Sequence, residues 1–156
     1  MAESKRQKGR SRADGQSYFI FLLILSIGLH FVFPIRTVLH APYTYFGIII
    51  IGFGIVMGLW SRSLLLKSET TLSPYESPTS LVTSGPFHIS RNPIYLGMAA
   101  ILSGVAIVLG TLVTFAFPAL FIMIVETFLI PDEERRLEKI FGEQYREYKN
   151  TVRQWI

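Results

Sequence analysis

The segment Arg91–Pro131, "RNPIYLGMAAILSGVAIVLGTLVTFAFPALFIMIVETFLIP", places two apolar stretches on either side of Gly110. A polar Arg-Asn-Pro cluster stands directly before the first stretch, residues 94–109, and Glu126 is the one charged residue in the second, residues 111–130. Apolar runs of this length are typical of membrane helices. The segment therefore predicts a tight helical hairpin that penetrates most or all of the bilayer.

Two earlier stretches, residues 18–35 and 43–60, are also apolar enough to cross a hydrocarbon core of about 30 Å, which needs roughly 20 helical residues. Half of the chain is hydrophobic, in long blocks. We therefore expect an all-α integral membrane protein with about four transmembrane helices. The absence of a small-residue cleavage pattern favours an uncleaved first helix over a signal peptide. In the second stretch, the glycines Gly47, Gly52, Gly54 and Gly58 predict close helix packing.

The basic residues indicate the orientation, because Lys and Arg are enriched on the cytoplasmic side. Five precede the first span, three lie between the second and third, six follow the fourth, and Arg36 alone falls on the other side. Both termini are therefore expected in the cytoplasm, at the inner membrane of a bacterium or the endoplasmic reticulum of a eukaryote. Residues 1–17 are expected to be a disordered basic arm near anionic lipid, without a nucleic-acid partner. Residues 18–156 form the expected single domain.

Cysteine is absent, which excludes disulfides, thiolate metal sites and a cysteine nucleophile. The three histidines, His30, His40 and His88, do not have the spacing of metal ligands. We therefore expect no metal site.

The polar cluster before the hairpin has two interpretations. Asn92 is a favourable N-cap and Pro93 suits a first helical turn, so the third span is predicted to start there. Arg91 would then extend to lipid headgroups, with nothing bound. Alternatively, a helix N-terminus beside an Arg is a ready anion site, since free N–H groups and the helix dipole add to the guanidinium charge.

After the last span the sequence predicts an amphipathic cytoplasmic helix over about residues 131–150, interrupted or bent near Gly142. Its apolar residues recur at helical spacing: Leu137, Ile140, Phe141, Tyr145, Tyr148, Val152 and Trp155. Glu133 and Glu134 at its start either cap the helix or face a site. Successive helical residues point about 100° apart, so one of the two is expected to face inward, and the row through Leu137 favours Glu134. Glu126 extends to the interface or lies near the pocket.

Two segments together resemble a known family. "LVTSGPFHISRNPIYLG" is similar to the L-V-x-x-G-[PY]-[FY]-x-x-x-R-H-P-x-Y-x-G segment of isoprenylcysteine carboxyl methyltransferases and their phospholipid methyltransferase relatives. "EERRLEKIFGEQYREYKNTVRQWI" resembles their E-E-x-x-L-x-x-x-F-G-x-x-Y-x-x-Y-x-x-x-V tail. The motifs occur in the family's order and flank the hairpin, and the resemblance covers about half of the chain.

This resemblance implies an integral membrane methyltransferase that uses S-adenosylmethionine and a lipid-like or small apolar acceptor. By position, it implies site roles for Arg91, Asn92 in place of the family's His, Pro93, Tyr95, Gly97, Glu133 and Glu134. Of these, Arg91, Asn92 and Glu134 are the expected catalytic residues. The cofactor's carboxylate, ammonium and adenine suit a cation, an acid and aromatic walls, for which Tyr145 and Tyr148 are further candidates.

Two other functions remain open at the level of sequence. A non-catalytic membrane scaffold could keep the same fold without binding the cofactor. A reductase of related architecture would bind a nicotinamide cofactor instead, although the chain is short for those many-span enzymes.

Overall fold

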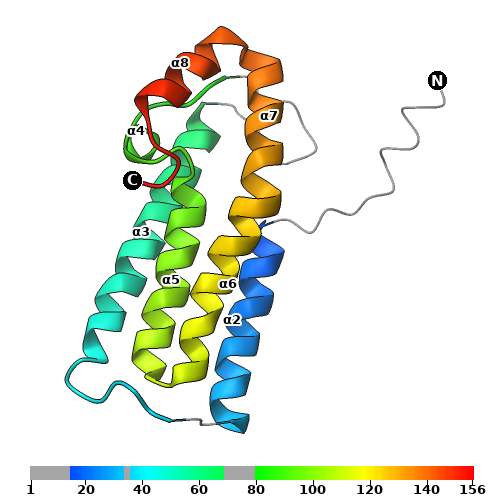
Figure 1. Cartoon of the computed structure of the whole chain (residues 1–156). Coiled ribbons are helices and arrows are strands. Elements are labelled where there is room, and N and C mark those ends of the chain that lie inside the picture. The colour runs from blue at the N-terminus through cyan, green and yellow to red at the C-terminus, as the bar shows by residue number, and fades with distance from the viewer. Residues whose placement is uncertain (1–14, 34–35, 69–79) are drawn as a thin grey trace, which may run out of the picture.

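The computed structural model describes residues 15–33, 36–68 and 80–156, and the expected basic arm lies almost wholly outside them. Within these ranges the chain is helical, with an isolated β-bridge between Thr37 and Thr111 and no strand (Figure 1). The helices are α2 (Gly15–Val32), α3 (Tyr45–Lys67), α4 (Pro86–Ile89), α5 (Pro93–Leu109), η2 (Leu112–Phe115), α6 (Ala116–Ile124), the π-helix η3 (Val125–Leu129), α7 (Ile130–Phe141) and α8 (Glu143–Thr151).

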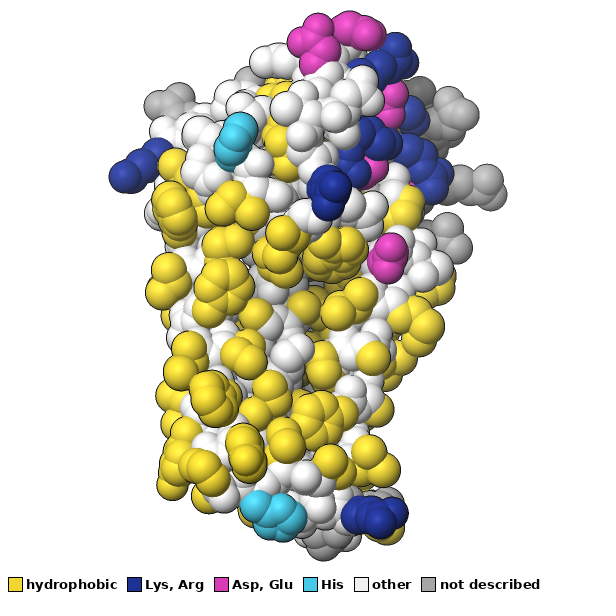
Figure 2. Space-filling model, turned by 60° about the vertical axis from the view of Figure 1, so that its left-hand side comes forward, with side chains coloured by type: hydrophobic (Ala, Val, Ile, Leu, Met, Phe, Trp, Pro, Cys, Tyr) yellow, Lys and Arg dark blue, Asp and Glu magenta, His cyan; other side chains and the backbone are white. Residues whose placement is uncertain are grey.

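Three helical stretches are long and apolar enough to cross a membrane: Gly15–Val32, Tyr45–Lys67 and the continuous run Leu112–Phe141. Helix α5 has 17 residues and is shorter, which corresponds to about 25 Å of helix. It nevertheless runs alongside the other three (Figure 1). On the face that Figure 2 shows, hydrophobic side chains cover the body of the molecule, and most of the charged side chains gather at one end. We call the end formed by α4, α7 and α8 the polar end.

The last membrane helix continues past its predicted end. The sequence predicts a span that stops at Ile130, but η3 leads directly into α7 without a break. Pro131 is in the first turn of α7. In a regular α-helix its ring would clash with the carbonyl four residues earlier, and the wider π turn just before it is compatible with the ring. The chain breaks at Gly142 instead, whose φ is 54°, at the position where the sequence predicts an interruption.

The hairpin between α5 and α6 turns at Gly110, as the sequence predicts. This residue ends α5 in the left-handed conformation, with φ of 66°. Its carbonyl accepts hydrogen bonds from the N–H groups of Val38 and Leu39, at 2.7 and 3.2 Å. The turn is thereby attached to the chain between α2 and α3 at the end opposite the polar end.

Glycine sets the distance between α3 and α5, which run antiparallel. A Cβ at Gly54 would lie 2.5 Å from the carbonyl oxygen of Gly97, and one at Gly97 would lie 2.7 Å from that of Gly54. Gly47 and Gly104 face each other in the same way two turns along. Such close backbone approach between membrane helices requires small residues. Gly52, by contrast, has open space around it and takes no part in this contact.

The π-helix η3 changes which residues of the last membrane helix face inward. The inward positions are Phe117, Phe121, Val125, Ile130 and Glu134. Their spacing is four residues, except for the five-residue step across η3 from Val125 to Ile130. One extra residue rotates everything beyond it by about 100°. Glu134 therefore continues the row that ends at the buried Ile130.

Candidate functional site

Ser90–Asn92, which we call the Arg91 segment, lies at the polar end and connects α4 to α5. Ser90 is buried, and its hydroxyl accepts a hydrogen bond from the N–H of Asn92 at 3.1 Å. Pro93 is buried as the first residue of α5, as the sequence predicts. This tight connection places Arg91 beside the N-terminus of α5, within reach of α7 and α8.

Arg91 and Glu134 form a nearly buried ion pair. The distance from Arg91 Nη2 to Glu134 Oε1 is 3.0 Å, and the side chains are 9% and 13% exposed. Lys149 of α8 approaches the other carboxylate oxygen, with Nζ 2.9 Å from Oε2. Glu134 therefore lies between two cations. Removing one partner of such a pair is costly, because the other charge is left buried.

Two atoms of this pair have unused hydrogen-bonding capacity. Arg91 Nε and Glu134 Oε1 are buried and make no hydrogen bond within the described part of the chain. Oε1 is close to Nη2, but that contact is an ion pair without hydrogen-bond alignment. Buried polar groups almost always have partners. A buried donor and a buried acceptor on two paired side chains, each without a hydrogen bond, are suited to a ligand that carries both an anionic and a cationic group.

Glu133 also points toward α5. It accepts a hydrogen bond from the Tyr95 hydroxyl at 2.6 Å. The expectation that only one of the adjacent acids would face inward is therefore too simple. The two carboxylates contact different neighbours, Glu133 a phenol and Glu134 two cations.

Asn92 occupies the N-cap position of α5, but its side chain does not cap the helix. The amide Nδ2 instead donates to the carbonyl of Gln154 at 3.2 Å. The expected side-chain cap is therefore wrong: a cap needs Oδ1 to accept from an N–H of the first turn, whereas the amide is held through its Nδ2 donor by the returning C-terminal chain. The backbone N–H groups in the first turn of α5 remain uncapped by this side chain.

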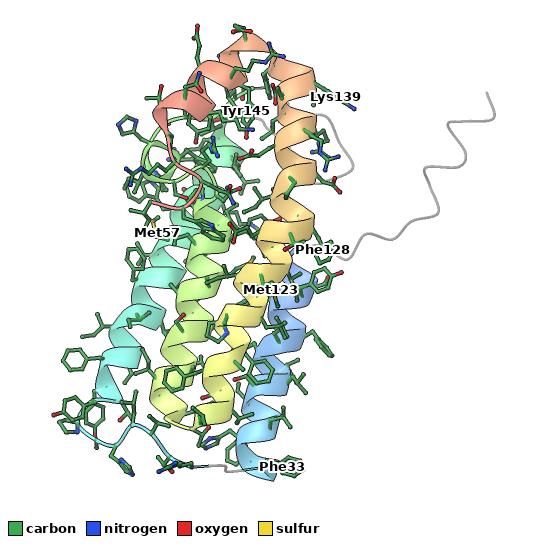
Figure 3. The ribbon with its side chains drawn as sticks, viewed as in Figure 1. Phe33, Met57, Met123, Phe128, Lys139 and Tyr145 are labelled. Atoms are coloured by element: carbon green, nitrogen blue, oxygen red, sulfur yellow. The ribbon has the colours of Figure 1, made fainter. Side chains whose placement is uncertain are left out.

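Tyr145 and Tyr148 of α8 are buried next to each other, with ring centroids 6.1 Å apart. The Tyr148 hydroxyl donates to the carbonyl of Phe87 in α4 at 2.6 Å. Tyr145 lies at the polar end, whereas Phe33 lies at the other end of the helical bundle (Figure 3). Burial, together with the negative charge of Glu134, raises the pKa of Tyr145. Burial also raises the pKa of Tyr148, to about 12, although Arg91 acts in the opposite direction.

The raised pKa values of Tyr145 and Tyr148 predict that the protein loses stability at alkaline pH. Unfolded tyrosines ionise near pH 10, whereas folded Tyr148 stays protonated until about pH 12. Between these values the folded state binds more protons than the unfolded state. The contribution of Tyr148 to the free energy of unfolding is therefore fully present below about pH 10 and is lost as the pH rises toward 12. Tyr148→Phe should show a shallower decline in the free energy of unfolding between pH 10 and 12, measured by denaturant titration in detergent. An unchanged decline in the variant would contradict this assignment.

Gly97 lies away from the ion pair, against α3. Its predicted place at the cofactor has a packing explanation, since a Cβ there would meet the backbone of Gly54. Glu126 is likewise not among the residues around Arg91: its side chain is exposed on η3. The structure thus brings together Arg91, Asn92, Tyr95, Glu133, Glu134, Tyr145 and Tyr148, with Pro93 starting the helix behind them.

Sequence reasoning missed several groups at this site. Lys149 had no assigned role, although it pairs with Glu134. The carbonyls of Lys149 and Gln154 accept hydrogen bonds from Arg91 Nη1 and Ser90 Oγ, at 3.0 and 3.1 Å. Lys149 directly follows Tyr148 in the predicted amphipathic helix, and this position was a weak signal that its side chain could lie at the site. Backbone carbonyls have no sequence signature, so nothing pointed to the others.

No group of three His, Asp or Glu residues lies together in a way that would hold a metal ion in residues 15–33, 36–68 and 80–156. The arrangement at the polar end is one of fixed charges instead. It combines a guanidinium, a carboxylate and a helix N-terminus over buried aromatic rings. Such a site can bind and orient a zwitterion.

Comparison with known proteins adds independent information. The family model of the phospholipid methyltransferases matches residues 43–144, which is more than half of the chain. An uncharacterized protein of Haemophilus influenzae is 36% identical over 63 residues, which span 40% of this chain and all of the relative. No solved structure matches significantly. The match extends from α3 through the Arg91–Glu134 pair to α8, and the chain therefore belongs to the phospholipid methyltransferase family.

Proposed function

We propose that this protein is an integral membrane methyltransferase that uses S-adenosylmethionine and binds it at the Arg91–Glu134 pair. The observation that carries the proposal is the pair of buried atoms, Arg91 Nε and Glu134 Oε1, that make no hydrogen bond in the described chain. The amino acid part of the cofactor has a carboxylate for the first and an ammonium for the second. Membership of the family supports the same reaction class.

Each residue then has a role in binding and orientation. Arg91 binds the carboxylate, helped by the positive end of α5. Glu134 binds the ammonium, and Lys149 contacts its other carboxylate oxygen. Glu133 is held by Tyr95, which orders the wall beside them. Bound cofactor supplies a methyl group already activated on a sulfonium, so the protein has mainly to position it against the acceptor.

Asn92 takes no part in proton transfer in this scheme. The family's usual residue at this place is His, whereas an amide does not titrate near neutral pH. Its hydrogen bond to the Gln154 carbonyl supports a positioning role instead. The acceptor in this proposal is lipid-like or a small apolar molecule, because the exposed sides of α2, α3 and α6 are apolar and suited to contact with lipid.

The two adjacent carboxylates test the proposal. Glu134→Gln should weaken binding of S-adenosylhomocysteine, the stable product, by about tenfold or more, because a charge-assisted hydrogen bond to the ammonium is lost. Glu133→Gln keeps the contact with Tyr95 and should have a smaller effect. Isothermal titration in detergent gives the affinities, and thermal unfolding confirms that both variants fold.

Full binding in Glu134→Gln would place the cofactor elsewhere. A well-folded wild type that binds neither S-adenosylmethionine nor its product would favour a scaffold. Thermal stabilisation by NADPH in place of S-adenosylmethionine would favour a reductase.

We further propose that α5 is a fourth span, with α7, α8 and both termini on the cytoplasmic side. This orientation follows the basic residues: among those in residues 15–33, 36–68 and 80–156, Arg36 alone lies at the opposite end. Since the chain has no Cys, single cysteines report cleanly, and Asn150 and Thr37 are both exposed. A cysteine at Asn150 should react with impermeant reagent only from the cytoplasm, and one at Thr37 only from outside. The reverse labelling pattern would show that the protein is inserted in the opposite orientation.

A further inference from the structure

The last five residues, Val152–Ile156, return across the Arg91 segment, and we call them the C-terminal strap. Two of its carbonyls accept hydrogen bonds there. That of Arg153 accepts from the N–H of Arg91 at 3.0 Å. That of Gln154 accepts from Ser90 Oγ at 3.1 Å and from Asn92 Nδ2 at 3.2 Å. The strap therefore contacts three consecutive residues of the segment, all through its main chain.

Two apolar side chains hold the strap in place. Val152 is buried with Tyr145 and Tyr148 under α8. Trp155 packs against the core that α2, α5, α6, η3 and Ile130 of α7 form inside the bundle. Ile156, the next residue, is 68% exposed. Trp155 is thus the last anchored residue, and the Gln154 carbonyl lies between it and Val152.

The strap restricts Arg91 without neutralising it. Arg91 Nη2 faces Glu134, Nη1 donates to the carbonyl of Lys149 just before the strap, and the backbone N–H donates to the strap itself. Carbonyls are neutral acceptors, so they fix direction and leave the positive charge available. Of the guanidinium nitrogens, Nε alone makes no hydrogen bond or ion pair within the described chain.

We propose that the C-terminal strap is a positioning element of the cofactor site, in which Trp155 anchors the carbonyls that fix the backbone of Ser90–Asn92 and thereby the place from which Arg91 meets the bound carboxylate. This inference rests on the proposed function, because it needs Arg91 to bind the cofactor. Trp155 then acts through Arg91 and does not touch the ligand. Its loss should free the strap, allow Arg91 to reorient and weaken binding, although no ligand contact has been removed.

The test is a double-mutant cycle between Trp155 and Arg91, with S-adenosylhomocysteine as the probe. Trp155→Ala should weaken binding by about fivefold or more, a smaller loss than direct removal of the contact. Ile156→Ala is the matched control and should bind like wild type, because its side chain is exposed. Trp155→Phe should restore most of the affinity by refilling the same apolar site. If Trp155→Ala does not fold, Trp155→Leu replaces it in the cycle, since it keeps apolar bulk.

In the Arg91→Ala background, Trp155→Ala should have no further effect on affinity, since the group it positions is gone. Equal losses in both backgrounds, or full affinity in a folded Trp155→Ala variant, would overturn the positioning role. A different result, full affinity in a folded Arg91→Ala variant, would contradict the proposed function. The two failures are therefore distinguishable.

Discussion

Replacing Arg91 by Ala is expected to lower the affinity for S-adenosylhomocysteine by at least about tenfold and to reduce the free energy of unfolding by about 3 kcal/mol. The loss of affinity follows from the missing partner for the cofactor's carboxylate. The loss of stability follows from Glu134, which is 13% exposed and keeps only Lys149 as a partner. That remaining cation keeps the cost at the lower end of the range for a broken buried pair.

Arg91→Lys separates charge from geometry. Lysine keeps the positive charge, but it cannot contact Glu134 and the Lys149 carbonyl while presenting a third donor in a planar fork. Its affinity should fall between those of wild type and Arg91→Ala. Titration calorimetry and denaturant unfolding in the same detergent measure both quantities.

The matched control is Arg135→Ala at the same end of the molecule. Arg135 is 72% exposed, and its contact with Asp132 is a loose 3.6 Å. Exposed pairs of this kind contribute little, so both quantities should remain close to wild type. Unchanged affinity in Arg91→Ala would leave Arg91 with only a structural role in its ion pair with Glu134. Losses of similar size in both variants would indicate a general effect of charge.

The second large effect is expected where α3 meets α5. Gly54→Ala should destabilise the fold by about 2–3 kcal/mol, because its Cβ would lie 2.5 Å from the Gly97 carbonyl oxygen and the helices would have to separate. Gly52→Ala, two residues earlier in the same helix, has open space around it. That change should be neutral or stabilising by up to about 1 kcal/mol, because alanine is the better helix former.

The opposite signs of these two substitutions make the test specific. Unfolding by a denaturing detergent, with helicity as the signal, gives both free energies. Equal effects at Gly52 and Gly54 would show that helix propensity dominates and that the close contact is unimportant. Gly54→Ala should also weaken cofactor binding, since α5 starts at the Arg91 segment and would shift with the interface.

Part of the site follows from sequence because it depends on local rules. Pro93 follows a residue suited to the N-cap position and favours the first turn of a helix, and apolar runs of about 20 residues are long enough to cross a bilayer. The two motifs also singled out Arg91 and Glu134, which the structure joins at 3.0 Å. The motifs marked these residue types, but they did not predict that the two side chains would meet.

The distinction between Glu133 and Glu134 depends on helix packing. Helical periodicity favoured Glu134 without excluding Glu133, because the prediction treated the cytoplasmic helix as one regular helix that begins after the membrane span. The π turn at Val125–Leu129 adds a residue within the membrane and sets the rotation of all that follows. The place of Gly97 at the cofactor stays a prediction from the motif, and its contact with Gly54 could not be foreseen, because that requires knowing which helix lies opposite.

The sequence by itself determined the helical class, the apolar stretches, the start of α5 and the residue types of the site. The tertiary structure alone decided the partners of those residues, including Lys149 beside Glu134 and the C-terminal carbonyls beside Arg91 and Asn92. The physical reason is that helices and spans arise from interactions between near neighbours and with lipid. Contacts between residues about 60 positions apart arise from packing, and a backbone carbonyl is the same in every residue.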